Sequence, residues 1–118
     1  MEILFIVGQA IFGGFFLMTG ANHFMKLKDM TGYAASKKVP APKLATLATG
    51  LLLVLGGLGI ILQSYVTLAL WAVIIFLVPT SLIMHTFWKE TDPQVKMMEM
   101  TQFMKNMALA GAALMLLA

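Results

Sequence analysis

Four apolar stretches of 17 to 21 residues, set around two lysine-bearing segments, constrain the fold of this chain most. They cover residues 3–22, 44–62, 66–86 and 102–118. All eight lysines lie within residues 26–43 or 89–105, so that only Lys105 falls inside an apolar stretch, near its start. Roughly 20 helical residues cross a hydrocarbon core of about 30 Å. The pattern therefore predicts four membrane-spanning helices.

The composition excludes a water-soluble domain. Of the 118 residues, 60% are hydrophobic and 11% are charged, and the mean hydropathy is +0.90, which exceeds what a soluble domain of this size buries. We predict an all-α fold in which residues 1–118 form a single integral membrane four-helix bundle with up-down topology. The first stretch lacks a positively charged leader, so we expect it to be a permanent anchor.

The positions of the lysines predict the orientation in the membrane. The first loop carries five lysines and the third loop two, whereas the short turn Gln63-Ser64-Tyr65 is uncharged. By the positive-inside rule, both long loops face the cytoplasm and both termini face outward. The expected location is the plasma membrane (in bacteria, the cell inner membrane), with lipids as partners and no nucleic acid.

Both lysine-bearing loops contain signals for helix boundaries. Residues 29–38 predict a short interfacial helix with Met30, Tyr33 and Ala34 toward lipid and Lys37 and Lys38 toward headgroups. The segment Val39-Pro40-Ala41-Pro42 ends it, and its last proline suits the first turn of the second span. Farther on, Thr91 or Asp92 caps a helix that begins at Pro93 and continues into the fourth span as one helix.

Small and polar residues at helical spacing predict how the spans pack. Because apolar side chains gain nothing by leaving lipid for another helix, membrane helices associate through close contact at small residues and through polar contacts. We interpret seven residues as facing the bundle: Gln9, Gly13 and Gly20 in the first span, Gly50 and Gly57 in the second, and Ala108 and Ala112 in the fourth. We expect Gln9 to make an interhelical hydrogen bond. For the small residues, a dimer interface is the alternative to packing within the bundle.

Polar groups from three spans converge at the end of the bundle that carries the lysines. His23 ends the first span and His85 nearly ends the third. The candidate ligand-binding residues are His23, His85, Asn22, Ser81, Asn106 and Lys105. Each histidine has three interpretations: capping a helix end, binding a ligand or handling protons, or binding a metal. Because HxxxH and HExxH spacings are absent, we predict no metal site. Pro79 predicts a kink that opens a cavity in the third span.

An ordered set of motifs resembles the DoxX family of small four-helix membrane proteins. The motifs are Gly20-Ala21-Asn22-His23-Phe24, Gly32-Tyr33 followed by Val39-Pro40-Ala41-Pro42, Gly56-Gly57-Leu58-Gly59, and Phe103-Met104-Lys105-Asn106 with Gly111. The matching positions are Gly20, His23, Phe24, Pro40, Pro42, Gly57, Lys105 and Asn106. The resemblance implies an inner-membrane four-helix bundle. Some members of the family are membrane subunits linked to quinone reduction, others join complexes tied to oxidative stress, and distant relatives assist assembly of membrane proteins. No catalytic residue transfers with the resemblance.

Two classes of function follow. In the first, the chain is a non-catalytic or accessory membrane subunit of a quinone-linked redox or stress-related complex: a redox partner docks on its cytoplasmic face, and the histidine cluster binds a quinone or a lipid headgroup. The absence of cysteine removes thiol chemistry, so no covalently bound cofactor is expected and a redox role uses another cofactor. The second class is a small-molecule transporter resembling small multidrug exporters, although the interiors of the predicted spans carry no carboxylate. Membrane-enzyme and assembly-factor roles stay open as well.

Overall fold

The computed structural model describes residues 2–118 and contains only helices over that range. The elements are α1 (Glu2–Met25), α2 (Leu27–Ser36), α3 (Pro42–Leu62), α4 (Val66–Met84), the 3-10 helix η1 (Phe87–Lys89) and α5 (Pro93–Leu117). The predicted all-α class is confirmed. Three helical segments, Glu2–Met25, Pro42–Leu62 and Val66–Lys89, are long and apolar enough to cross a membrane. Helix α5 is not among them, so the fourth span stays a prediction.

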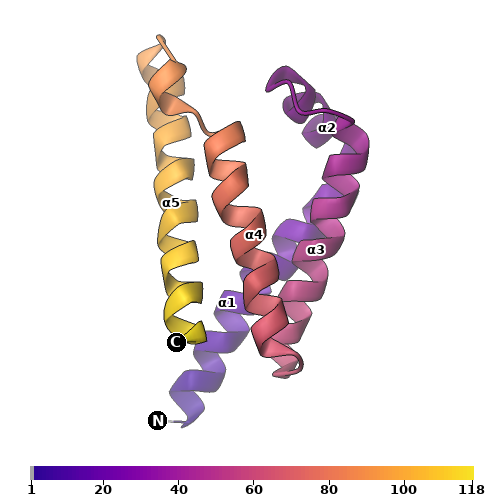
Figure 1. Ribbon diagram of the computed structural model, residues 1–118, viewed down its shortest axis with the longest axis vertical. Coiled ribbons are helices and arrows are strands. Elements are labelled where there is room, and N and C mark those ends of the chain that lie inside the picture. Colours follow the sequence, from indigo (N-terminus) through magenta and orange to yellow (C-terminus); the bar gives the residue numbers. More distant parts are fainter. Residues whose placement is uncertain (1) are drawn as a thin grey trace.

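The four long helices run alternately up and down the molecule (Figure 1). Both termini lie toward one end, and α2, η1 and the loops that contain the lysines lie at the other end. The longest dimension of the structure is 46 Å. That length matches a bilayer with its headgroup regions, which together measure about 40–45 Å.

The helix boundaries follow the signals in the two loops. Asp92 caps α5, because its carboxylate accepts a hydrogen bond of 2.9 Å from the backbone N–H of Gln94, and Pro93 is the first helical residue. As predicted, α5 then continues without a break into the apolar C-terminal stretch. Pro42 occupies the first turn of α3, after Lys38 and Ala41 have taken left-handed backbone conformations with φ of 64° and 46°.

Helices α1 and α3 pack backbone to backbone along a glycine seam, which we define as Gly13 and Gly20 of α1 with Gly50 and Gly57 of α3. A Cβ atom on Gly57 would lie 2.7 Å from the carbonyl oxygen of Gly13, and one on Gly20 would lie 2.8 Å from that of Gly50. At the end of the molecule that carries the termini, the Gln63 amide donates a 2.6 Å hydrogen bond to Gln9. Close approach and a polar contact thus hold this pair of helices together, as is common for helices in lipid.

Helix α4 joins the α1–α3 pair to α5. Its buried side chains, which include Leu70, Val73 and Leu77, share one core with Leu53 of α3 and Ala113 of α5.

The predicted small-residue pair on α5 does not face this core. Ala108 is exposed and Ala112 is only partly buried, because the inward face of the helix passes instead through Asn106, Ala110 and Ala113. A dimer interface at that pair stays a prediction.

Candidate ligand cavity

A cavity of about 460 Å³ lies between the α1–α3 pair and the α4–α5 pair, toward the end that carries α2. It exists because α1 packs closely against α3 but has few contacts with α4 and α5. Helix α2 closes the cavity at this end through Met30, Tyr33 and Ala34. Small-molecule sites in proteins have volumes of about 300–1,000 Å³ and mostly apolar walls with a few placed polar groups.

The walls of the cavity are mainly apolar, and several of the lining residues are exposed at the surface of the molecule. Phe15 of α1 and Ile75 and Ile83 of α4 line the cavity, yet they are 38%, 60% and 51% exposed. These residues belong to helices that are apolar enough to cross a membrane. The cavity is therefore open toward the surface that contacts lipid.

His23 lies in the wall with one ring nitrogen occupied. It is 5% exposed, and Nδ1 lies 2.8 Å from the carbonyl oxygen of Thr19. A carbonyl only accepts hydrogen bonds, so we assign the proton of the neutral ring to Nδ1. Nε2 has no hydrogen-bond partner among residues 2–118. The ring also packs edge-on against Phe76, and the His23 Cβ lies at the site where Gly50 has no side chain.

Asn106 supplies a second polar group to the wall from the opposite side. It is 4% exposed, lines the cavity, and makes no side-chain hydrogen bond within residues 2–118. At the preceding residue of α5, the Lys105 amine donates to the Gln102 side chain at 2.7 Å and lies 5.4 Å from the centre of the Phe15 ring. Because the Asn106 amide makes no side-chain hydrogen bond to the protein, it is free to bind a polar group of a ligand in the cavity.

A second polar group of residues, the Glu99 cluster, consists of Glu99 with Tyr33, Lys37 and His85. Glu99 is 3% exposed on α5. It accepts hydrogen bonds from the Tyr33 hydroxyl at 2.9 Å and from the Lys37 amine at 2.8 Å, and His85 Nδ1 lies 3.3 Å away. Glu90 adds a longer contact of 3.5 Å to Lys37. The cluster ties α2 to α5 across the mouth of the cavity.

The hydrogen bonds within the Glu99 cluster fix its charges. Burial alone raises the pKa of Glu99, but hydrogen bonds from Lys37, Tyr33 and His85 outweigh burial and lower that pKa. For Lys37, burial opposes the charge, yet the hydrogen bond to Glu99 and the negative charge of that carboxylate raise the pKa. Burial and the hydrogen bond to Glu99 both raise the pKa of Tyr33. Near neutral pH, the carboxylate and the amine are therefore both ionised.

The structure places four of the six predicted ligand-binding residues at the cavity. His23, His85, Lys105 and Asn106 line it, whereas Asn22 does not. Ser81 is fully buried, and its hydroxyl donates to the Leu77 carbonyl at 2.8 Å, so it faces its own helix. Near Pro79 the cavity wall is made by that proline with Ile75 and Thr80. Among residues 2–118 there is no group of three or more His, Cys, Asp or Glu arranged to hold a metal.

The expected orientation of the short loop helix was wrong. Met30, Tyr33 and Ala34 were expected to face lipid, but Ala34 is buried and Met30 lines the cavity. Lys37 was expected to face the headgroups, but Lys37 and Tyr33 both donate hydrogen bonds to Glu99. The reason is that the buried Glu99 carboxylate needs hydrogen-bond donors, and α2 and the residue after it supply two, the Tyr33 hydroxyl and the Lys37 amine. Glu99 itself was missed as a site residue, although it shares one face of α5 with Gln102 and Asn106 through steps of three and four.

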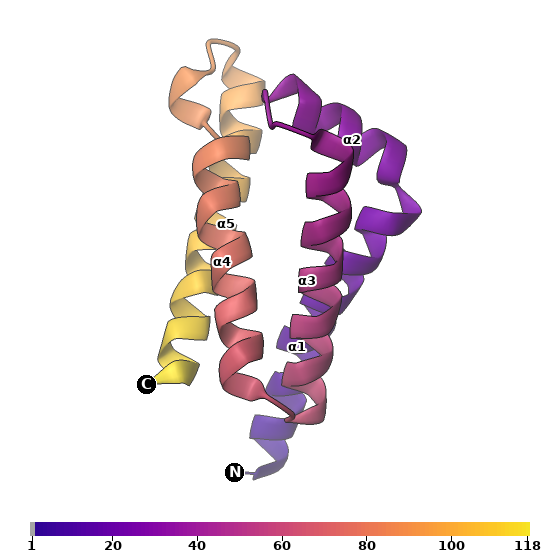
Figure 2. The same ribbon diagram turned by 45° about the vertical axis from the view of Figure 1, so that its right-hand side comes forward.

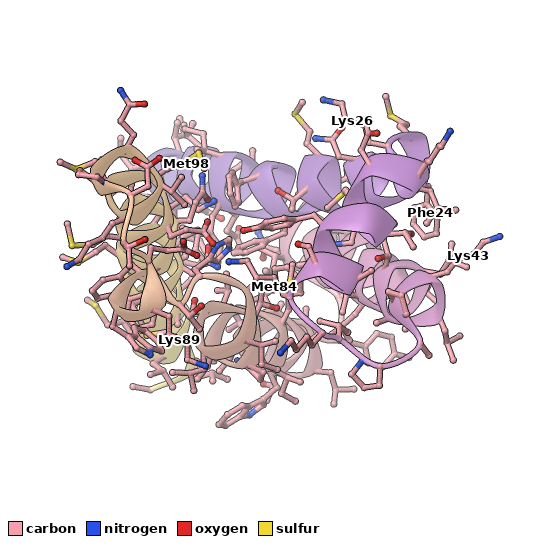
Figure 3. The ribbon with its side chains drawn as sticks, turned by 90° about the horizontal axis from the view of Figure 1, so that it is seen from above. Phe24, Lys26, Lys43, Met84, Lys89 and Met98 are labelled. Atoms are coloured by element: carbon pink, nitrogen blue, oxygen red, sulfur yellow. The ribbon has the colours of Figure 1, made fainter. Side chains whose placement is uncertain are left out.

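Seen from the end with the loops, three lysines outside the Glu99 cluster, Lys26, Lys43 and Lys89, lie at the edge of the molecule. In Figure 3, Lys26 and Lys43 point outward at the edge of the molecule near α1, α2 and α3, and Lys89 lies on the opposite side, near α4 and α5. Met84, whose carbonyl is 3.3 Å from the Tyr33 hydroxyl, lies closer to the middle. These outer lysines are therefore free to contact phospholipid headgroups.

In a comparison with protein-family models, residues 5–86 match the family described as DoxX. The match covers α1 to α4, including His23 and Tyr33, and ends before α5, so that Glu99 and Asn106 lie outside it. No significant match was found among curated proteins or among solved structures.

Proposed function

This chain belongs to the DoxX family of membrane proteins, and from that premise and the geometry of the cavity we propose that it is a four-span accessory subunit of a quinone-linked redox complex. In this proposal the quinone binds in the cavity, and a redox partner docks on the cytoplasmic face. The observation that supports the proposal most is the apolar cavity of about 460 Å³ in which two buried polar side chains have ring or amide atoms without protein partners.

The chemistry of the cavity fits a quinone. A quinone is a flat apolar ring with polar oxygens at opposite edges, and the walls offer apolar side chains together with the polar groups of Asn106 and Lys105. Asn106 and Lys105 have N–H donors for those oxygens. The exposed lining residues Ile75 and Ile83 give access from the lipid phase, where quinones reside. The bound quinone would supply the two-electron chemistry, and this chain would bind and orient it.

Binding of a quinone to the purified protein in lipid nanodiscs tests this proposal, with decyl-benzoquinone as the probe. Leu52 lines the cavity, whereas its neighbour Leu51 is 54% exposed on the outer face of α3. We expect Leu52→Trp to fill the cavity and weaken binding about tenfold or more, and Leu51→Trp to leave it unchanged. Equal affinity in both variants, or an absence of binding to the unchanged protein, contradicts the proposal.

The fourth span and the orientation are part of the same proposal. The apolar stretch of α5 beyond Asn106 completes the bundle, and the loops with lysines face the cytoplasm. Because the sequence contains no cysteine, a cysteine introduced at Ser64 or Ser36 is the only thiol. A membrane-impermeant reagent should label position 64 in intact cells and position 36 only after lysis. The reverse pattern contradicts the orientation.

Docking of a redox partner is tested by copurification in mild detergent. If the outer lysines form the docking surface, Lys26→Glu together with Lys43→Glu should release the partner at lower salt, because surface charges act mainly through long-range attraction. Glu2→Lys, a charge reversal at the other end of the molecule, is the control. Retention of the partner by both variants contradicts docking at this face.

The Glu99 cluster bears on the transporter alternative. A proton-coupled exporter needs a buried carboxylate that takes up and releases a proton near neutral pH. Glu99 is a buried carboxylate, but Lys37 and Tyr33 hold its pKa below the ordinary value, so it stays ionised. This favours the accessory-subunit proposal over proton-coupled transport.

A further inference from the structure

The two histidines that line the cavity each have a free ring nitrogen that can accept a hydrogen bond but cannot donate one. His23 Nδ1 is occupied by the Thr19 carbonyl, and His85 Nδ1 lies 3.3 Å from the ionised Glu99 carboxylate. Both of these partners only accept hydrogen bonds, so each neutral ring has its proton on Nδ1 and a lone pair on Nε2. Both histidines line the cavity, and neither Nε2 has a partner among residues 2–118.

We propose, on the basis of the function proposed above, that the cavity selects the hydroquinone over the quinone, because only a hydroxyl can donate to the free Nε2 atoms of His23 and His85. A quinone carbonyl only accepts, so beside a histidine lone pair it leaves both atoms unpaired. A hydroquinone hydroxyl donates to Nε2, and its oxygen still accepts from the donors of Asn106 and Lys105.

Asn106 does not discriminate between the two forms, and this makes the histidines decisive. Its side chain carries both a carbonyl and an amino group, and its amide is free of protein hydrogen bonds within residues 2–118. It can therefore serve a carbonyl or a hydroxyl by turning over. The Lys105 amine has donors only and serves the oxygen of either form. The selection thus rests on the ring nitrogens of the two histidines.

Three ligands that share one apolar body separate this inference from the proposed function. They are decyl-benzoquinone, its hydroquinone kept reduced under anaerobic conditions, and the di-O-methyl ether of that hydroquinone, which cannot donate. We expect the hydroquinone to bind the protein in nanodiscs about tenfold more tightly than the other two, since two net hydrogen bonds of about 0.7 kcal/mol each give the roughly 1.4 kcal/mol that corresponds to a factor of ten. If none of the three binds, the proposed function fails. If all three bind with equal affinity, the quinone site stands and the selection is overturned.

Substitution of each histidine tests whether its Nε2 atom causes the preference for the hydroquinone. His23→Leu and His85→Leu should each reduce the preference for the hydroquinone over the quinone to about threefold or less, because each variant removes one acceptor for a hydroxyl. Phe24→Leu is the matched control, because this neighbour of His23 is exposed and does not line the cavity. A full preference in both histidine variants overturns the inference. The comparison of ligands on the unchanged protein decides the question even if a variant fails to fold.

A redox titration gives an independent measurement. Tighter binding of the hydroquinone stabilises the reduced form and therefore raises the midpoint potential of the bound quinone/hydroquinone pair. For a two-electron couple a factor of ten corresponds to about 30 mV, so a tenfold preference should raise the potential by about 30 mV relative to the same pair in lipid. The shift should shrink in His23→Leu. An unchanged or lowered potential for the bound pair overturns the inference.

Discussion

The two long interfaces of this molecule are built in opposite ways. Along the glycine seam, α1 and α3 meet backbone to backbone, and a Cβ on Gly57 would lie 2.6 Å from the Leu17 nitrogen. Helix α1, in contrast, has few contacts with α4 and α5, and toward the end that carries α2, Tyr33 and Lys37 of α2 bind Glu99 of α5 across the gap. Close approach leaves no space for a ligand, whereas long side chains can close an interface and still leave a cavity behind them.

Removal of Glu99 should give the largest change in this comparison. Glu99→Ala leaves Lys37 without its closest partner and Tyr33 without an acceptor at 2.9 Å, so we expect a loss of about 3 kcal/mol in the free energy of unfolding. Helicity followed by circular dichroism during denaturation in mixed micelles measures it. Glu90→Ala is the control, because Glu90 is more exposed and its only contact to Lys37 is 3.5 Å. That change should cost about 0.5 kcal/mol or less. Similar losses in the two variants would show that the cluster does not hold the interface.

The same difference explains what could be predicted from the sequence. The glycine seam was visible because residues such as Gly13 and Gly20 recur at helical spacing, and small residues in an apolar helix have few other uses. The helix ends were visible because Pro42 and Asp92 act on their immediate neighbours. Both signals are local, so a single stretch of sequence carries each of them.

The cavity mouth was only partly predictable. His23 and His85 stood out as polar residues at the ends of apolar stretches, and both line the cavity. Glu99 lies in a charged loop segment, where a carboxylate is ordinarily solvated. Tyr33 lies in a segment whose own pattern predicts an amphipathic interfacial helix, so neither residue stood out as a site residue. The two residues are 66 positions apart, and their hydrogen bond depends on how α2 folds back over α5. No periodicity within either segment encodes that contact.

An added methyl group on the glycine seam should give the next largest effect. Gly57→Ala places a Cβ against two backbone atoms that cannot move independently of their helix, so we expect a loss of about 2 kcal/mol. Gly14→Ala is the matched control, because nothing lies within 4 Å of a Cβ there. The control should be neutral or slightly stabilising, since alanine favours helix over glycine. A neutral Gly57→Ala would mean that the seam is looser than its backbone distances indicate.

Acid should weaken the Glu99 cluster and leave the glycine seam untouched. The pKa of Glu99 is lowered in the folded state, so its contribution is present above the ordinary value of 4.5 and is lost as the pH falls through the folded-state pKa. The pKa of Lys37 is raised, so its contribution is lost only as the pH rises through a value above 10.5. Melting temperatures measured between pH of about 6 and 3 should fall more steeply for the unchanged protein than for Glu99→Gln. Parallel curves would place the acid sensitivity elsewhere.

The hydrogen bond between Gln9 and Gln63 should show the smallest effect, and it tests whether the seam needs polar contacts at all. The bond is 2.6 Å long, but polar pairs between membrane helices contribute only about 0.6 kcal/mol on average. A double-mutant cycle with Gln9→Leu and Gln63→Leu measures the coupling directly. A coupling near 0.6 kcal/mol, well below the cost of Gly57→Ala, would show that close backbone contact dominates this interface. A coupling above 2 kcal/mol would reverse that ranking and make the seam, like the cavity mouth, an interface that depends on side-chain hydrogen bonds.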